Sequence, residues 1–500
     1  MKHEFKLQFG LHIIIVILLI FISSKNFFRF DFSKNKIYTL TKYTKNIFEN
    51  LNEELTLTWI ASDNVKKFFP NVNYLEELLK QYASLNNCTF EIQNSSTLSQ
   101  TALTNLDIYP QQITSSTRDE ERLVNVYSAV LIEYKGMTKV LPYVFDLQEI
   151  EYTIANNVLA LIEDSEGLSQ KRFVYILTFP KALDTNYIYV TPFLEYENFI
   201  PIRVHEENLT SLNSEIPLIV IGSSFITDEQ IQMIDSFLQA GGNAAFFISG
   251  VKIDVDGNWA CTPKVNDKLL SLLADYGFII AQDLLLDIFN FPLNMTSTDG
   301  RTSEIINYPF WLRINSEQAD LSQAFFSGFN TLQMYWASSL DLDLRLNKNL
   351  KPVLTTSSQA KRMFEKFLTD PFLFSEKNTE SLEKNKYILA AISESKQKIF
   401  VTTDENILSR CIEFTNSDAN IKTLCAITQW LNNKEELLKL KNKISTLAPF
   451  KTFEKENVIT DTKIFSQVLN LLVVPLIILL VFIFKIFFIN ANKKIQASEV

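Results

Sequence analysis

One histidine and one pair of serines are the residues of this sequence that could support nucleophilic chemistry. The chain has three histidines. His3 lies in the N-terminal tail and His12 in an apolar run, so His205 alone remains for a Ser-His-Asp or Cys-His-Glu apparatus. His205 lies in Arg203-Val204-His205-Glu206, which carries no nucleophile signature. We interpret it as an ordinary surface or edge-strand residue.

The serines follow a run that is typical of a buried strand. Gly222-Ser223-Ser224 stands where parallel α/β sheets usually bind ligands. The segment lacks the G-x-S-x-G elbow of serine hydrolases, so we interpret both serines as turn residues. The chain also contains neither G-x-x-x-x-G-K-[ST] nor G-x-G-x-x-G. We therefore expect neither a P-loop ATP site nor a Rossmann dinucleotide site.

Acidic clusters give no specific signal of catalysis or metal binding. Asp254-Val255-Asp256-Gly257-Asn258 is shorter than a calcium loop and lacks its glutamate, so a tight turn is the better interpretation. Asp119-Glu120-Glu121, or Glu149 with Glu151, could form an acid/base pair. Any acidic chain offers such pairs, so they carry no weight. We expect no catalytic, cofactor-binding or metal-binding residue in this chain.

The four cysteines are Cys88, Cys261, Cys411 and Cys425. They form no C-x-x-C pair and lie near no histidine, which argues against a zinc site. We interpret them as small buried hydrophobic residues, and a disulfide between two of them stays open. The net charge of −10 argues against a nucleic-acid partner, because phosphate binding needs a basic face.

An apolar segment near each end of the chain predicts a membrane anchor. Leu7 to Ser24 is uncharged and bounded by Lys6 and Lys25, which predicts a span over 7–28. A cleaved signal peptide is the alternative. No small-x-small cleavage site is evident before Lys25, which favours an uncleaved anchor.

The second apolar segment is longer. Ile464 to Phe484 is uncharged and predicts a span over 464–489, in which Pro475 is tolerable. Basic residues follow it and favour a cytoplasmic C-terminus; these are Lys485, Lys493 and Lys494. Two spans then place both tails, 1–6 and 490–500, in the cytoplasm. The remaining body is expected outside the cytoplasmic membrane.

The first part of this body, residues 29–165, predicts a small α/β domain. Thr41 suits the N-cap of a helix that runs to Leu51. A helix over Val72 to Leu85 would direct one apolar face inward, made of Val72, Leu75, Leu78, Leu79 and Tyr82. Strands are expected at Leu55 to Ile60, Cys88 to Gln93 and, as a hairpin turning at Lys135-Gly136, at Val124 to Val144; a helix is expected at Glu149 to Ile162.

The second part, residues 170–435, predicts a parallel α/β domain. Two continuous apolar runs, Phe173 to Leu177 and Pro217 to Gly222, are typical of strands covered on both faces. Thr227 to Gln230 forms a capping box that opens a helix, and Gly241-Gly242 ends it. Further elements are expected as a strand at Asn243 to Ile248, a helix capped by Asn266 and ending at Tyr276-Gly277, strands at Pro352 to Thr356, Tyr387 to Ile392 and Lys398 to Thr402, and a helix at Asn420 to Leu431. Residues 436–463 remain as a juxtamembrane linker.

The order of several segments between the two anchors resembles the GldG-type family of ABC transporter auxiliary proteins, first associated with gliding motility. The resemblance covers almost the whole length. It is carried by Arg29 to Ser33 with Tyr38 to Thr41, by Pro217 to Ile221 with Gly241-Gly242, by Leu272 to Phe278 with Asp283 and Asp287, by Val353 to Ser357, and by Ile399 to Asp404 with Ala426 to Leu431 and Glu435-Glu436.

This resemblance implies a role beside an ABC ATPase and a multi-span permease. It also implies a glutamine-amidotransferase-like domain without catalytic residues. Relatives usually have a glycine-histidine-glycine turn after the first strand of that domain, whereas this chain has Phe179-Pro180-Lys181, so a ligand role for the turn is in doubt.

We therefore expect an α/β protein with a small thioredoxin-like domain, then a doubly wound amidotransferase-like domain, flanked by one transmembrane helix at each end. The expected function is a non-enzymatic auxiliary subunit of an ABC transporter in the cytoplasmic membrane, binding a substrate or partner of unknown identity. The alternatives are a structural envelope or motility component and a divergent hydrolase on the amidotransferase-like fold.

Overall fold

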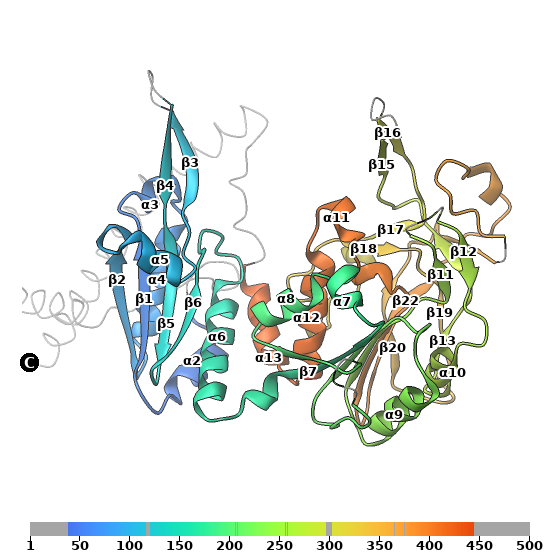
Figure 1. Ribbon diagram of the computed structural model, residues 1–500, viewed down its shortest axis with the longest axis horizontal. Coiled ribbons are helices and arrows are strands. Elements are labelled where there is room, and N and C mark those ends of the chain that lie inside the picture. The colour runs from blue at the N-terminus through green and yellow to red at the C-terminus, as the bar shows by residue number, and fades with distance from the viewer. Residues whose placement is uncertain are drawn as a thin grey trace, which may run out of the picture. The chain divides into compact units, whose positions relative to one another are not determined.

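The computed structural model describes residues 39–444, apart from 117–120, 206, 208, 256, 258, 297–302, 365 and 375 (Figure 1). All the elements below belong to one compact unit that ends at Ser445. Within the described part of the chain, no helix has the length and apolar character needed to cross a membrane. The spans predicted at 7–28 and 464–489 lie outside the described residues.

The first domain is built on a sheet with the strand order β2-β1-β5-β6. β1 pairs in parallel with β2 and antiparallel with β5, and β6 is antiparallel to β5. The strands are β1 (Leu55–Ala61), β2 (Cys88–Asn94), β5 (Ser128–Tyr134) and β6 (Met137–Leu141). The helices are α2 (Lys42–Glu49), α3 (Val65–Phe68), α4 (Val72–Ala83), α5 (Gln100–Asn105) and α6 (Ile150–Ser165), with a short turn of 3₁₀-helix η2 (Ser95–Thr97).

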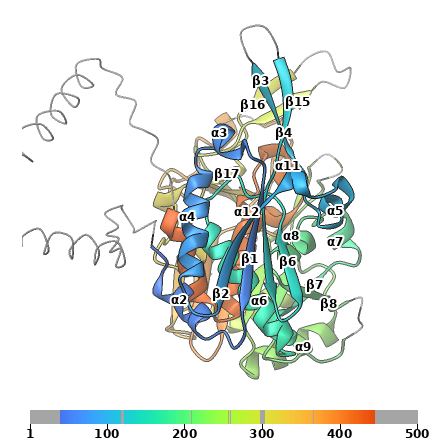
Figure 2. The same cartoon turned by 90° about the vertical axis from the view of Figure 1, so that its left-hand side faces the viewer.

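Helix α4 lies over one face of this sheet (Figure 2). The inward face predicted from its periodicity is confirmed, because all five of its residues are fully buried: Val72, Leu75, Leu78, Leu79 and Tyr82. Alternate residues of β1, among them Leu57 and Trp59, meet this helix, while Ile60 faces a smaller cluster with Leu103 of α5. The Thr41 cap is also confirmed, since its side chain accepts a hydrogen bond from the backbone N–H of Thr44.

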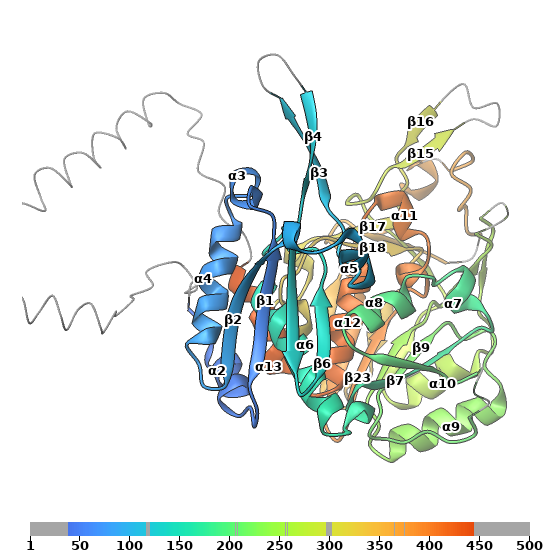
Figure 3. The same ribbon diagram turned by 60° about the vertical axis from the view of Figure 1, so that its left-hand side comes forward.

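A separate two-stranded ribbon rises from the first domain (Figure 3). It consists of β3 (Gln111–Ser116) and β4 (Glu121–Val126). The hairpin turn predicted at Lys135-Gly136 is confirmed between β5 and β6, where both residues have positive φ. The prediction was wrong at its start, because Val124 to Val126 belong to the ribbon and not to β5.

The second domain contains a nine-stranded sheet in the order β13-β19-β22-β23-β10-β9-β7-β8, with β20 paired to β22. Strands β8, β7, β9, β10 and β23 run parallel to one another, and every other pairing in the sheet is antiparallel. Their bounds are β7 (Phe173–Thr178), β8 (Ile200–Arg203), β9 (Leu218–Ile221), β10 (Ala244–Phe247), β13 (Phe278–Ile280), β19 (Leu340–Leu342), β20 (Leu350–Thr355), β22 (Ile388–Glu394) and β23 (Lys398–Thr402).

Helices cover both faces of this sheet (Figure 1). Alternate residues of one strand reach opposite cores: Ile219 packs with α8 and α12, whereas Val220 packs with α9 and α10. The helices are α7 (Ala182–Thr185), α8 (Val190–Tyr196), α9 (Asp228–Gln239), α10 (Lys268–Asp275), α11 (Ile412–Thr415), α12 (Ala419–Leu431) and α13 (Glu435–Leu438). The predicted capping box of α9 is confirmed, with Thr227 and Gln230 bonded reciprocally.

Short paired strands and 3₁₀ turns complete the second domain. The strands are β11 (Val251–Ile253), β12 (Cys261–Pro263), β14 (Leu284–Leu286), β15 (Leu293–Thr296), β16 (Ser303–Ile306), β17 (Trp311–Ile314), β18 (Leu332–Tyr335) and β21 (Lys361–Met363). The turns are η3 (Ser169–Arg172), η4 (Ser316–Gln318), η5 (Ala324–Phe326), η6 (Glu376–Thr379), η7 (Asn406–Leu408) and η8 (Lys439–Ile444). Residues 436–444, which the sequence placed in a linker, therefore form the end of α13 and η8.

Candidate functional site

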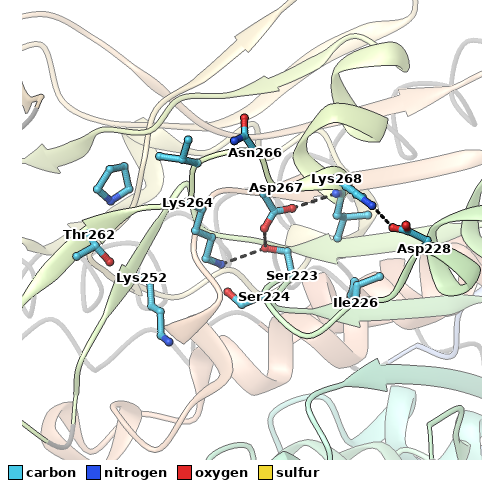
Figure 4. Close-up of a pocket in the computed structure, with 13 residues that line it drawn as sticks. Ser223, Ser224, Ile226, Asp228, Lys252, Thr262, Lys264, Asn266, Asp267 and Lys268 are labelled. Atoms are coloured by element: carbon cyan, nitrogen blue, oxygen red, sulfur yellow. Dashed lines mark hydrogen bonds and ion pairs between the residues drawn. The ribbon is translucent and has the colours of Figure 1, made fainter.

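A polar pocket lies where strand β9 ends, beside the β11–β12 ribbon and the start of α10 (Figure 4). Its volume is about 440 Å³. This is the edge at which open parallel α/β sheets bind their ligands. The side chains that line it are mostly polar, and include Ser223, Ser224, Lys252, Thr262, Asn266 and Lys268.

An ion pair between Lys264, which lines the pocket, and Glu405, which is not among the lining residues, is called the floor of the pocket below. Lys264 Nζ lies 2.5 Å from Glu405 Oε2, and the lysine side chain is only 4% exposed. Glu405 follows β23, so the pair joins the ribbon wall of the pocket to the parallel sheet. The backbone N–H of Glu405 donates to Ser249 Oγ after β10, which fixes the segment that carries the carboxylate. Each charge has its partner, which is the condition for keeping ions away from water.

Ser223 is held between this lysine and an aspartate. Lys264 Nζ donates to Ser223 Oγ at 3.2 Å, and Ser223 Oγ donates to Asp267 Oδ2 at 2.5 Å. Figure 4 shows both contacts. A nucleophilic serine needs a neighbouring base with a free lone pair. The ion-paired ammonium has none, and the proton of Ser223 is directed at a carboxylate that is itself occupied. The arrangement suits the binding of a polar group better than acyl transfer.

Asp267 is occupied because it begins helix α10. Its Oδ1 accepts hydrogen bonds from the backbone N–H groups of Leu269 and Leu270 at 3.0 and 3.1 Å. The prediction that Asn266 caps this helix was wrong by one residue. Asn266 has a φ of 59°, so it forms the left-handed turn before the cap. Both residues are good N-caps by type, and only the backbone conformation distinguishes them.

Two exposed groups complete the rim of the pocket. Lys268 pairs with Asp228 at the start of α9. Lys252 projects from β11 and forms no ion pair with any described residue. A salt bridge between exposed groups contributes little to stability. The rim can therefore rearrange around a ligand at low cost, while the floor stays fixed.

His205 lies away from the serines. It is exposed after the edge strand β8 and lines a separate small hollow with Phe179, Pro180 and Lys181. Lys181 has a φ of 63°, and Phe179 is largely exposed. His205 and Ser223 therefore line different hollows and do not form a catalytic dyad. This agrees with the interpretation of His205 as a surface residue and of Ser223 as a turn residue.

The acidic clusters do not form a common site either. Asp254 accepts backbone hydrogen bonds from Gly257 and Trp259, as expected of a turn. Asp119 and Glu120 lie outside the described residues, and Glu149 and Glu151 lie at the junction of the two domains. No group of His, Cys, Asp or Glu among the described residues could hold a metal ion.

The cysteines are free thiols in the positions that the structure describes. Burial raises the pKa of Cys88, Cys261 and Cys411 to about 12. Burial raises the pKa of Cys425 as well. A thiol must lose its proton to act as a nucleophile or metal ligand, so these four suit packing.

Sequence reasoning missed the lysine and the glutamate of the floor. Lys264 and Glu405 are separated by 141 positions, and neither belongs to a recognisable motif. The positions of the strand ends nevertheless indicated in part which residues meet at this edge of the sheet. Parallel strands of one sheet bring the residues after them to one edge, and Ser223 and Glu405 follow β9 and β23, the two strands on either side of β10.

Two comparisons with known proteins cover most of the chain. Residues 157–426 match a family model described as an ABC-type uncharacterized transport system. Residues 34–133 match a domain of unknown function. The chain is also similar to an uncharacterized protein of Borreliella burgdorferi, with 24% identity over 497 residues, which cover 96% of this chain and 97% of that protein. The similarity therefore extends over both domains.

Proposed function

Because the chain belongs to the family of ABC-type uncharacterized transport system proteins, we propose that it is a non-enzymatic auxiliary subunit of an ABC transporter. The observation that carries the second half of this proposal is the floor of the pocket. There Ser223 lies between Lys264, whose ammonium pairs with Glu405, and Asp267, whose carboxylate also caps α10. This arrangement suits hydrogen bonding to a ligand better than activation of the serine as a nucleophile.

The proposal also covers the subfamily of the chain and the fold type of each domain. We place the chain with the GldG-type proteins of this family. The strand order β2-β1-β5-β6, with β1 and β2 parallel, supports a thioredoxin-like first domain. The parallel strands β8, β7, β9, β10 and β23, covered by helices on both faces, support an amidotransferase-like second domain. Open parallel α/β sheets bind their ligands at strand ends of this kind, and here these ends carry the Lys264–Glu405 pair and Ser223.

The proposed topology has one anchor at 7–28 and one at 464–489, with both tails in the cytoplasm and the two domains outside the cytoplasmic membrane. The apolar segments and the lysines after Phe484 support it. The partners would be an ABC ATPase, which supplies the energy, and a multi-span permease, on which the anchors dock. The polar pocket would then bind the transported substrate or a protein of the envelope.

Purification of the full-length chain from its native membrane in mild detergent tests this function. We expect an ABC ATPase and a multi-span permease to copurify. Recovery of envelope or motility components without either would contradict the proposal and support the structural alternative. A reporter fused after Val500 tests the topology, and it should be active on the cytoplasmic side. Activity on the outer side would exclude the arrangement with two anchors.

A further inference from the structure

The last described segment of the chain, α13 and η8 at residues 435–444, packs on both domains and is called the terminal strap below. Leu437 and Leu440 are buried against Tyr152 and Ala155 of α6 in the first domain. Asn442 faces the second domain, where its Oδ1 accepts a hydrogen bond from the backbone N–H of Gly328 at 2.9 Å and its Nδ2 donates to Ser327 Oγ at 3.0 Å. The strap therefore fills the junction between the domains.

Lys443 joins the two ends of the described chain. Its Nζ pairs with Glu151 of α6 and also donates to the backbone carbonyl of Thr39. The other oxygen of Glu151 accepts hydrogen bonds from the Thr41 N–H at 2.8 Å and from Thr44 Oγ1 at 2.7 Å. Both charged side chains are almost fully buried, at 6% and 2% exposure. One carboxylate thus holds the first helix of the body and its last turn.

Lys441 makes a second contact of the same kind. Its Nζ lies 3.6 Å from Glu149 Oε2 in the first domain and 3.6 Å from Glu197 Oε1 in the second domain. It also lies 4.1 Å from the ring centroid of Tyr152. Burial by itself would lower the pKa of Lys441, but Glu197 and Glu149 together raise it. The lysine therefore stays charged between the domains and bridges them.

The covalent connection between the domains is fixed independently. Arg172 in η3 pairs with Asp164 and lies 3.2 Å from Glu163 at the end of α6, and it donates to the Asn198 carbonyl at 2.9 Å. Helix α6 also contacts the second domain directly, since Asn156 Nδ2 donates to the carbonyl oxygen of Glu197 at 3.1 Å and Gln429 Nε2 donates to the Tyr152 hydroxyl at 3.4 Å. The strap is thus an additional non-covalent connection at another part of the junction. It can leave only if Lys441 and Lys443 go to water together and Glu151 stays behind without its cation. A polar junction packed in this way is either docked or released, and it has no stable intermediate arrangement.

We propose that the terminal strap is a latch. When docked, it restricts the movement of the two domains relative to each other and ties α2 to η8. When released, it leaves the contacts of Arg172 and the direct contacts of α6 between the domains, which can then move further. The chain continues from Ile444 toward the second predicted anchor. The latch stands on the described residues alone. Only its proposed trigger, a displacement of that anchor by a transporter partner, rests on the proposed function.

Hydrogen exchange of the full-length chain in detergent tests the latch. In Lys443→Met, we expect exchange in residues 435–444 and at the start of α2 to rise at least about a hundredfold, as when a buried pair loses one partner. Strands β1 and β7 should keep their protection. Lys439→Met is the matched control, because Lys439 lies in the same segment but pairs with Glu436 in an exposed contact. It should leave exchange unchanged.

Two further variants keep the test decisive if Lys443→Met fails to fold. Asn442→Ala removes only contacts with the second domain and should raise strap exchange with the sheets still protected. Glu151→Gln keeps an acceptor for the Thr41 N–H but removes the charge that Lys443 pairs with, and it should also raise strap exchange. Spin labels at Glu91→Cys and Gln239→Cys should report a broader distance distribution in Asn442→Ala. Unchanged strap exchange in every variant, or an unchanged distance distribution in Asn442→Ala, would overturn the latch.

Discussion

Two buried lysine–carboxylate pairs in this chain have different surroundings. Lys264 and Glu405 lie under an open pocket of about 440 Å³, and the glutamate side chain retains 18% exposure. Lys443 and Glu151 lie at the domain junction, where the glutamate side chain is 2% exposed. Water or a ligand can compensate Glu405 if its partner is lost. Neither can reach Glu151 unless the strap moves.

A lysine–glutamate pair therefore has a different role at each place: one shapes a pocket, and the other holds distant segments of the chain together. The pocket pair lies within one domain and, with Ser223, shapes a polar surface. The junction pair connects residues 292 positions apart and decides how parts of the chain are held together. Removing one partner of a buried pair costs most where the other partner cannot be solvated. Substituting one residue of each pair should therefore cost more stability at the junction than at the pocket.

Glu151→Ala should give the largest loss of stability. It leaves the Lys443 ammonium, the Thr41 N–H and Thr44 Oγ1 without their shared acceptor. We expect the free energy of unfolding to fall by about 3–5 kcal/mol, measured by urea unfolding. Glu436→Ala, which removes an exposed pair with Lys439, should cost less than about 1 kcal/mol. Equal effects of the two changes would contradict the ranking.

Lys264→Met should have a smaller effect. The methionine fills most of the buried volume of the lysine stem, and Glu405 can turn toward the water of the pocket. We expect a loss of about 1–3 kcal/mol in the free energy of unfolding. Hydrogen exchange of the strap should not change, because the pocket and the junction share no partner. A loss as large as that of Glu151→Ala would mean that the pocket floor is also closed to water.

Asp404, which precedes Glu405, gives a pH-dependent test of the sheet edge beneath the pocket. Burial raises the pKa of Asp404 well above its usual value, despite hydrogen bonds from the Tyr335 and Asn406 N–H groups. A raised pKa means that its stabilising contribution is complete below the unfolded pKa, near 4, and is lost as pH rises through the folded pKa.

The stability advantage of the wild-type chain over Asp404→Asn should therefore shrink as pH rises above about 4, by up to ~1.4 kcal/mol per pH unit. Urea unfolding between acid and neutral pH measures this difference. Asp107→Asn, at an exposed position of the first domain, is the matched control. An advantage that grows with pH would mean that Asp404 is ionised and stabilising in the folded chain.

The serines should give the smallest effects. Ser223→Ala removes a buried hydroxyl bonded to Asp267 and Lys264 and should cost about 1 kcal/mol. Ser224→Ala, at an exposed position, should stay within about 0.5 kcal/mol. Transport by the intact complex should survive His205→Ala, because His205 lies outside the pocket, whereas Ser223→Ala and Ser224→Ala should weaken binding at the pocket without abolishing transport. Abolition of transport with normal folding in His205→Ala or Ser223→Ala would revive the hydrolase alternative.

Local patterns predicted the elements of both domains well, because helix and strand periodicity depend on near neighbours in sequence. The five inward residues of α4 and the capping box of α9 are examples. The start of β5 was misplaced because Val124 and the residues after it alternate equally well in either strand. The cap of α10 was misplaced because Asn266 and Asp267 have similar capping preferences.

The charged pairs could not be predicted in the same way. Lys264 meets Glu405 across 141 positions, and Lys443 meets Glu151 across 292. Lysines and glutamates are abundant throughout the chain, and nothing in the sequence near these four residues marks them as buried. Their partners are set by which strands and helices are neighbours in space. Residues 436–444 were predicted as a linker for the same reason, because the contacts that order them are made with distant parts of the chain.

The central claim is that the chain works by binding next to transporter partners and not by its own chemistry. Cross-linking of the full-length chain in intact native membranes, followed by mass spectrometry, tests it most directly, because no detergent separates the partners. We predict cross-links to an ABC ATPase complex, most of them to its membrane-spanning subunit. Cross-links confined to envelope or motility components, with no transporter subunit among them, would contradict the claim.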